Sequence, residues 1–458
     1  MKLHRILMTL FILGIILAGS AHATKLPLDV YIRSAKIEVL SGDLERYQTA
    51  IQYLDSVSFY YGPHAEAYFW MSQIYVDLIE KTPNLDEKKP NVEKYVAYCD
   101  SLKMTCENKE LDKKHRKGCK DFTEKEDSTT VKYWREFYNA AVQQLQQIDV
   151  TKSDQRAGTD TSQAAKEFFQ NKISDLADSA RMNMEMAILL DSTDHRPYLG
   201  LATAYEAKGE LAESTELLVK ALNLTEDSTS LLLQIAYNYI NQGDYCGSAP
   251  YLRAYVDKVP SDTGNLLNMA TVYNNCRELD SAVAMYRRLL EENPNNTDAL
   301  AGIGKYFNQV ALGVMDSVHV AQDAKNEAAV KKWQDIRNNY FDSAKVYFGE
   351  AFAVAPDDKS VAEDYAVVCY ITGDYSGAIQ PFSKLTELDP ASSDNWTSLG
   401  DCYLKTQQFD KAARAYEKVV ELEPNNMGVW ENLKELYHEL KETGNYEKAQ
   451  AKLQKGKG

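Results

Sequence analysis

The sequence predicts an all-α fold, a superhelical solenoid in which antiparallel helix pairs stack side by side. Three observations predict it. Apolar residues recur at intervals of three and four, which is the period of a buried helix face. Several residue classes return at a fixed step of 34 residues. Glycine and proline, which interrupt helices, fall between the apolar segments.

The 34-residue step holds for several kinds of residue. It separates Tyr205, Tyr239 and Tyr273, then Ala344, Ala378 and Ala412, and also Pro356, Pro390 and Pro424. A period of this length is typical of a repeated helix pair that buries its apolar face against the next pair.

Residues 393–426 carry the pattern most completely, with Trp396, Leu399, Gly400, Tyr403, Ala412, Tyr416 and Pro424. This segment resembles the tetratricopeptide repeat family, whose pattern is W-x2-L-G-x2-Y, then A-x3-F, then P. Small residues stand where the two helices cross, and large ones fill the surrounding grooves. The resemblance implies a concave groove, lined by the first helix of each pair, that binds partner peptides or proteins.

The repeats divide the chain into segments. Residues 195–296 contain three regular units, and 359–458 contain two more regular units followed by a polar cap. In the cap unit, 427–458, we expect three extra residues before a turn at Gly444 and Asn445. Residues 297–358 form a unit with 28 extra residues near 308–338, which we expect to extend both helices into a projecting hairpin.

Residues 24–194 diverge more strongly from the repeat. They contain a degenerate unit at 31–63 and a first helix at 65–81, whose partner we expect at 163–191. Between these helices we place an insertion at about 82–160. Its charged stretch, 107–127, reads as solvated helix or loop, and 131–148 reads as an apolar helix.

Residues 1–23 have the features of a secretory signal peptide. Lys2 and Arg5 precede a 14-residue apolar run, and small residues at Ala21 and Ala23 predict cleavage between Ala23 and Thr24. The run is short for a membrane span, which takes about 20 residues, although an uncleaved anchor is the alternative. Ser20 stands where a bacterial lipoprotein signal would place its lipidated cysteine, so we expect no lipid anchor. We therefore predict export to the periplasm, the cell envelope or the extracellular space.

Charge limits the partners. The chain has 51 basic and 67 acidic residues and a net charge of −16, which argues against nucleic acid and anionic lipid as partners.

The chain has no GxSxG, HExxH or GxxxxGK[ST] motif. Residues 302–305 match only the Gly-Lys pair of the phosphate-loop motif, at Gly304 and Lys305. We interpret this segment as a position where helices pack. We expect a non-catalytic scaffold without a metal or cofactor. The alternatives are an enzyme or enzyme accessory with its chemistry in 82–160, and a self-assembling homo-oligomer.

Seven cysteines, an odd number, follow the apolar run. Cys99, Cys106, His115 and Cys119 form a cluster, but six residues separate the first two cysteines, whereas structural zinc sites usually have two to four. A disulfide, zinc and free thiols all remain possible there.

A second disulfide is predicted between Cys246 and Cys276. Neighbouring antiparallel helices place both residues at the same edge of the stack. Closing this 30-residue loop would contribute roughly 3–4 kcal/mol. We interpret Cys369 and Cys402 as packing residues.

The repeat frame also predicts a polar inner row, which comprises Gln234, Tyr237, Asn241, Asn268, Asn274, Asn275, Lys305 and Asn308. Asparagine amides both donate and accept, so they can pair with a peptide backbone; the alternative is a merely solvated helix face. Chaperone-binding members of the family clamp a terminal carboxylate with basic residues. The corresponding positions here are acidic: Glu363, Asp364, Asp401, Glu431 and Glu435. They favour a basic partner.

Overall fold

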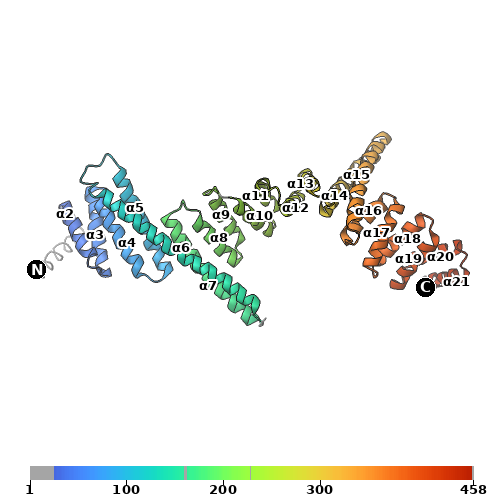
Figure 1. Ribbon diagram of the computed structural model, residues 1–458, viewed down its shortest axis with the longest axis horizontal. Coiled ribbons are helices and arrows are strands. Elements are labelled where there is room, and N and C mark those ends of the chain that lie inside the picture. The colour runs from blue at the N-terminus through green and yellow to red at the C-terminus, as the bar shows by residue number, and fades with distance from the viewer. Residues whose placement is uncertain (1–24, 159–161, 227, 456–458) are drawn as a thin grey trace. The chain divides into compact units, whose positions relative to one another are not determined.

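The computed structural model describes residues 25–158, 162–226 and 228–455. Within these ranges the chain forms twenty helices and no strand (Figure 1). The predicted signal peptide, with its cleavage site between Ala23 and Thr24, lies outside the described residues. Among the described helices, none combines the length and the apolar character that a membrane span requires.

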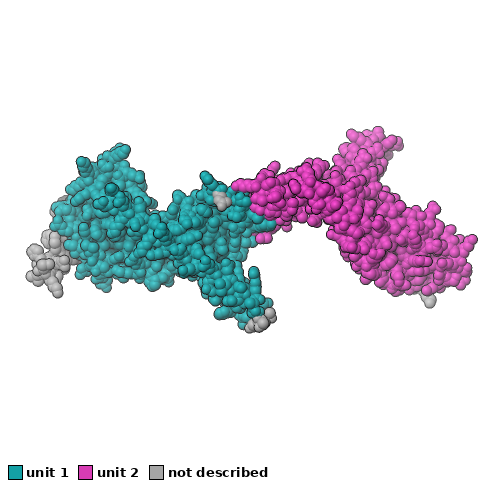
Figure 2. Space-filling model, viewed as in Figure 1, with its two compact units in different colours: residues 1–238 teal, residues 239–458 magenta. Residues whose placement is uncertain are grey.

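The chain divides into two compact units, Met1–Asn238 and Tyr239–Gly458 (Figure 2). The helices of unit 1 are α2 (Leu28–Val39), α3 (Leu44–Tyr61), α4 (Ala65–Lys81), α5 (Leu85–Glu107), α6 (Cys119–Ala157), α7 (Gln163–Leu190), α8 (Arg196–Lys208) and α9 (Leu211–Leu222). Helix α10 (Thr229–Asn241) contains the boundary. The helices of unit 2 are α11 (Tyr245–Lys258), α12 (Thr263–Asn275), α13 (Leu279–Glu292), α14 (Thr297–Asp323), α15 (Glu327–Val354), α16 (Lys359–Ile371), α17 (Tyr375–Leu388), α18 (Ser393–Lys405), α19 (Phe409–Leu422), α20 (Met427–Glu439) and α21 (Thr443–Lys455).

In unit 1 the partner of α4 is α5, and α6 pairs with α7. The expected pairing of 65–81 with 163–191 was therefore wrong. One core joins all four helices, with Ile79 from α4, Tyr95 from α5, Phe137 from α6 and Met186 from α7. The segment 82–160 therefore builds the stack itself instead of being inserted between two paired helices.

The charged stretch at 107–127 is exposed or partly exposed, as expected, with one exception: Glu126 is only 1% exposed. Its Oε1 accepts hydrogen bonds from Ser72 Oγ and from Gln73 Nε2, each at 2.7 Å. A buried carboxylate needs such partners to offset its desolvation. Glu126 therefore ties α6 to α4 inside the core.

Unit 2 is a series of helix pairs in which α12 packs on α13, α14 on α15, α16 on α17, α18 on α19 and α20 on α21. The pair α14 and α15 is the longest of them, with 27 and 28 residues against 13 and 14 for α12 and α13. Figure 1 shows these two helices running side by side beyond the neighbouring pairs. The extra residues at 308–338 thus lengthen both helices.

Glycine permits the closest helix contacts in unit 2. A Cβ atom at Gly400 would lie 2.6 Å from Cε1 of Tyr416, and one at Gly304 would lie 2.7 Å from Cδ1 of Phe348. Both rings are buried, so they have little room to move. Gly302 faces Tyr286 in the same way. Residues 302–305 thus belong to helix packing.

The turn inside each pair falls at a fixed repeat position with positive φ. Gly209, Gly243 and Gly373 hold it in three repeats, and Lys441 holds it in the last one, where φ is 59°. The expected turn at Gly444 was wrong, since Gly444 lies inside α21 and the cap unit has no extra residues before its turn. A non-glycine residue tolerates this conformation at a modest cost, which hid the turn from the sequence pattern.

A disulfide joins Cys246, near the start of α11, to Cys276 at the end of α12, with 5.4 Å between their Cα atoms. A second one joins Cys106 to Cys119. The remaining cysteines, Cys99, Cys369 and Cys402, are free and buried.

We predict that Gly400→Ala lowers the free energy of unfolding by about 1–3 kcal/mol, because the new methyl group overlaps the ring of Tyr416. The matched control is Gly313→Ala. Gly313 lies within α14 with open space around its Cβ position, so this change should stabilise the helix by roughly 0.5–1 kcal/mol. Urea unfolding of the two variants measures both effects, and equal stability would contradict the packing account.

We predict that Cys246→Ser/Cys276→Ser lowers the stability of α11 and α12 by roughly 3–4 kcal/mol. Without the disulfide, the unfolded chain regains the entropy that closure of a 30-residue loop had removed. Backbone hydrogen exchange should become faster in these helices and stay unchanged in α18 and α19. Unchanged exchange in α11 and α12 would show that this disulfide contributes little to stability.

Candidate functional site

Consecutive first helices of unit 2 are joined by polar contacts. Between α14 and α16, Lys305 Nζ lies 3.1 Å from Asp364 Oδ2. Between α16 and α18, the Tyr370 hydroxyl donates to Asp401 Oδ2 at 2.8 Å. These contacts place α14, α16 and α18 in one row, so their outward faces form a continuous surface.

Asp401 is a structural carboxylate. Besides Tyr370, it accepts a hydrogen bond from the Tyr416 hydroxyl of α19 at 2.5 Å. Burial, helped by the hydrogen bond to Asp401, raises the pKa of both tyrosines well above its ordinary value. Asp401 therefore has two internal partners and is less free to meet a ligand than the sequence suggested.

Helix α16 exposes a line of three residues that the core does not use. Glu363, Val367 and Ile371 are four residues apart, and Val367 and Ile371 are each 50% exposed. The core side of the same helix is buried at Ala362, Ala366 and Cys369. Sequence reasoning selected Glu363 and missed the two apolar residues, although their spacing, out of phase with the core, could have revealed them.

Steps of 34 residues extend this line to the later repeats. Thr397 and Asp401 on α18, then Glu431 and Glu435 on α20, occupy the positions of Glu363 and Val367. Glu431 and Glu435 are exposed. We call Glu363, Val367, Ile371, Glu431 and Glu435 the first-helix surface. It combines exposed apolar side chains with carboxylates.

Most amides of the predicted inner row are engaged within the chain. In unit 1, Gln234 Nε2 donates a hydrogen bond to Glu206 Oε1 at 3.1 Å. The side chains of Asn238 and Ser214 donate to the same oxygen. Glu206 therefore joins α8, α9 and α10, and Gln234 is part of that structural network.

In unit 2, Asn268 donates to Asn265 at 3.1 Å and Asn274 donates to the Tyr286 hydroxyl at 2.9 Å. Asn275 donates to the Thr271 carbonyl of its own helix at 2.9 Å. Each of these three amides therefore uses at least one N–H for a partner within the chain.

The other predicted residues are distributed over both units. Tyr237, in unit 1, is 37% exposed, and Asn241, in unit 2, is exposed. Lys305 is exposed but paired with Asp364, whose pKa is raised by burial despite this lysine. Asn308 has a buried Oδ1 that finds no hydrogen-bond partner among the described residues.

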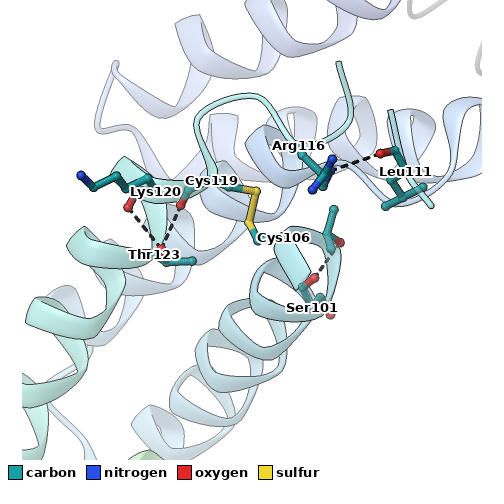
Figure 3. The surroundings of a disulfide bond; sticks show 8 residues. Ser101, Cys106, Leu111, Arg116, Cys119, Lys120 and Thr123 are labelled. Carbon is teal, nitrogen blue, oxygen red and sulfur yellow. Dashed lines mark hydrogen bonds between the residues drawn. A yellow bond between two sulfur atoms is a disulfide. The ribbon is translucent and has the colours of Figure 1, made fainter. Parts of the chain in front are cut away.

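The cysteine cluster of 82–160 is divided between two roles. Cys106 and Cys119 form a disulfide that joins the end of α5 to the start of α6 and closes the loop between them. Figure 3 shows the Arg116 side chain directed toward Leu111 across this loop. Arg116 Nε donates to the Leu111 carbonyl at 3.1 Å. Cys99 lies apart, with its Sγ 3.7 Å from Glu126 Oε2.

The free thiols are poorly suited to nucleophilic chemistry. Burial raises the pKa of Cys369 to about 11 and that of Cys402 to about 12, and it raises the pKa of Cys99 further still. The thiolate is the reactive form, so these thiols are inert near neutral pH. In the described part of the chain, no group of three or more His, Cys, Asp or Glu residues is arranged to hold a metal ion.

His64, the residue before α4, has a strongly displaced pKa. Its side chain is 2% exposed, and its ring centre lies 5.8 Å from that of His115. Burial, reinforced by the charges of His115 and Lys114, lowers the pKa of His64 to about 4. His64 is therefore neutral near pH 7.

Tetratricopeptide repeat models match three segments of the chain, residues 265–296, 336–393 and 393–426. These three segments therefore contain tetratricopeptide repeats. A comparison with curated proteins gave no match.

The chain is also similar to solved structures, of which three are named here. MamA from Desulfovibrio magneticus RS-1, residues 41 to the end, is 18% identical over 44% of this chain and 97% of that chain, with a TM-score of 0.32. A tetratricopeptide repeat protein from Parabacteroides merdae ATCC 43184 is 18% identical over 53% and 98%, with a TM-score of 0.26. YrrB, described as a TPR protein with an unusual peptide-binding site, is 19% identical over 55% and 97%, with a TM-score of 0.25.

We predict that unit 1 loses up to about 3 kcal/mol of stability as the pH falls from 6.5 to 4. Unfolded His64 takes up a proton near pH 6.5, whereas folded His64 resists it until about pH 4, so the stability is complete above pH 6.5 and is lost below it. His64→Phe, which cannot titrate, should lose this part of the pH dependence, whereas exposed His319→Gln should keep it. Hydrogen exchange of α4 at several pH values measures it; identical profiles for wild type and His64→Phe would refute the assignment.

Proposed function

We propose that this protein is an exported, non-catalytic scaffold that binds a protein or peptide partner in the concave groove of its repeat array. The observation that carries the proposal is the exposed line Glu363, Val367 and Ile371 on α16. A solvent-facing pair of β-branched apolar residues adds nothing to the core, but it can be buried by a partner.

The composition of the first-helix surface favours a basic partner with apolar anchors. Burying a Val or Ile side chain completely is worth about 1.5–3 kcal/mol, so the exposed halves of Val367 and Ile371 could each contribute roughly 1 kcal/mol. Glu431 would attract cations and accelerate association. Glu363 and Glu435 lie 3.9 Å and 2.8 Å from Lys359 and Lys434, which a basic partner would have to replace.

Two further observations support the scaffold and its export. The three free thiols are buried and have raised pKa values, which weighs against an enzyme that uses a cysteine nucleophile. The two disulfides are typical of an oxidising compartment, in keeping with the predicted signal peptide.

The test is a crosslinking pull-down from the native envelope with Glu363→Gln/Val367→Ser/Ile371→Ser. We expect a basic partner to be captured by wild type and lost with this variant, because the two apolar anchors and one carboxylate are gone. The matched control is Glu387→Gln/Leu388→Ser/Leu422→Ser, which removes one carboxylate and two apolar residues of similar exposure, 41% and 43%, from second helices α17 and α19.

The control variant should capture the same partner as wild type. Loss of the partner only with the control variant would move the binding surface to the second helices. Capture of only further copies of this chain would favour the self-assembling alternative.

A further inference from the structure

Unit 1 contains a cavity of about 360 Å³ that the scaffold function does not use. It lies between α2, the start of α4 and the loop that the Cys106–Cys119 disulfide closes. Its lining residues are Leu28, Asp29, Ile32, Arg33, Lys36, His64, Glu66, Lys114 and Lys117. The volume falls in the range of small-molecule sites, about 300–1,000 Å³.

The cavity is positively charged although the chain as a whole carries −16. Four cations line it against two carboxylates, Asp29 and Glu66, which gives 4 − 2 = +2. The side chains of Arg33, Lys114 and Lys117 make no ion pair with any described residue, and on the same loop Asp112 Oδ1 lies 2.7 Å from His115 Nδ1. These charges are therefore available to a ligand.

His64 is the second, independent sign of a ligand. It is 2% exposed and lines the cavity, and neither ring nitrogen has a described partner at ordinary hydrogen-bond geometry, although the Lys114 backbone lies close enough to oppose the fall in its pKa. Buried polar groups are nearly always hydrogen-bonded, and leaving one unpaired is costly. A neutral imidazole always carries one N–H that can donate to an acceptor.

The surrounding backbone adds to the positive potential. His64 is the N-cap of α4, which is 17 residues long, and its side chain makes no capping bond. The positive end of the helix dipole therefore points toward this end of the cavity.

The loop that supplies Lys114 and Lys117 is held in place. The disulfide closes it at both ends, the Ala65 amide donates to the His115 carbonyl at 2.9 Å, and His115 Nε2 lies 3.0 Å from the Tyr61 carbonyl oxygen. Fixing the lysines before binding lowers the entropy lost when a ligand arrives.

We propose that this cavity binds a small organic anion whose head group is a carboxylate or a phosphate. Arg33, Lys114 and Lys117 neutralise the head group, and His64 donates a hydrogen bond to it. Leu28 and Ile32 on the α2 wall contact a short apolar tail. This site is separate from the first-helix surface and does not depend on the proposed scaffold function.

The test is calorimetric titration of the full chain with hexanoate and with hexyl phosphate, two anions that share one tail. Both should bind at a single site, and hexylamine, with the same tail and the opposite charge, should not. Tighter binding of one anion identifies the preferred head group. Absence of binding by both anions at millimolar concentrations, or equal binding of hexylamine, would overturn the proposal.

Two double variants locate the site. Lys114→Ala/Lys117→Ala should weaken the preferred anion by about tenfold or more, as expected for losing charged hydrogen bonds. The matched control, Lys113→Ala/Lys120→Ala, removes two exposed charges of the same segment that do not line the cavity, and it should leave the affinity within about twofold of wild type. An equal loss of affinity in both variants would mean that the lysines act only by general electrostatic attraction, and it would overturn the assignment.

His64→Phe tests the hydrogen bond separately from the charge. It keeps all four cations and should also weaken binding by about tenfold, with the circular dichroism spectrum unchanged. Unaltered affinity in this variant would contradict the role of His64.

Discussion

The structure depends on close approach between helices that present glycine to a buried aromatic ring. Gly302 against Tyr286, Gly304 against Phe348 and Gly400 against Tyr416 each leave no space for a Cβ atom. A helix pair cannot bury its apolar side alone, so each pair must pack closely on the next. In other repeats a buried alanine, such as Ala236, Ala270 or Ala366, takes the position of Gly304 and Gly400. The side of each first helix that is left outside these contacts is then free to carry a binding surface.

The aromatic packing also accounts for part of the chain's acidity. Buried tyrosines reach the edge of the core with their hydroxyl groups, which donate to carboxylates of neighbouring helices, as Tyr133 does to Glu80 at 3.0 Å and Tyr437 to Glu417 at 2.8 Å. Asp401 accepts from two such hydroxyls. Several acidic residues therefore hold helices together, and these carboxylates keep their charge but are less available for direct contact with a partner.

The regular repeats were predictable because close packing imposes residue type and position together. The period located the helix pairs of 195–296 and 359–426, and the antiparallel geometry selected Cys246 and Cys276, which the structure joins. The turn at Lys441 escaped because its glycine signal was missing, and Gly444 offered a false one three residues later.

The N-terminal part and the candidate site were harder to predict. In α5 and α6 the buried residues, such as Tyr95 and Glu126, stand among exposed charges, so the apolar period is weak. The inner row identified polar residues but could not show that Gln234 and Asn274 already have partners. The anion cavity is lined by three segments that are far apart along the chain, and no local sequence motif predicts that they lie together.

The central claim is that the partner meets the first-helix surface, and site-specific photocrosslinking tests it most directly. A photoreactive residue placed at Val367 on α16, 50% exposed, is compared with one at Leu388 on α17, 41% exposed. The account predicts a covalent adduct with the partner from position 367 and none from position 388. An adduct from position 388 alone would contradict it.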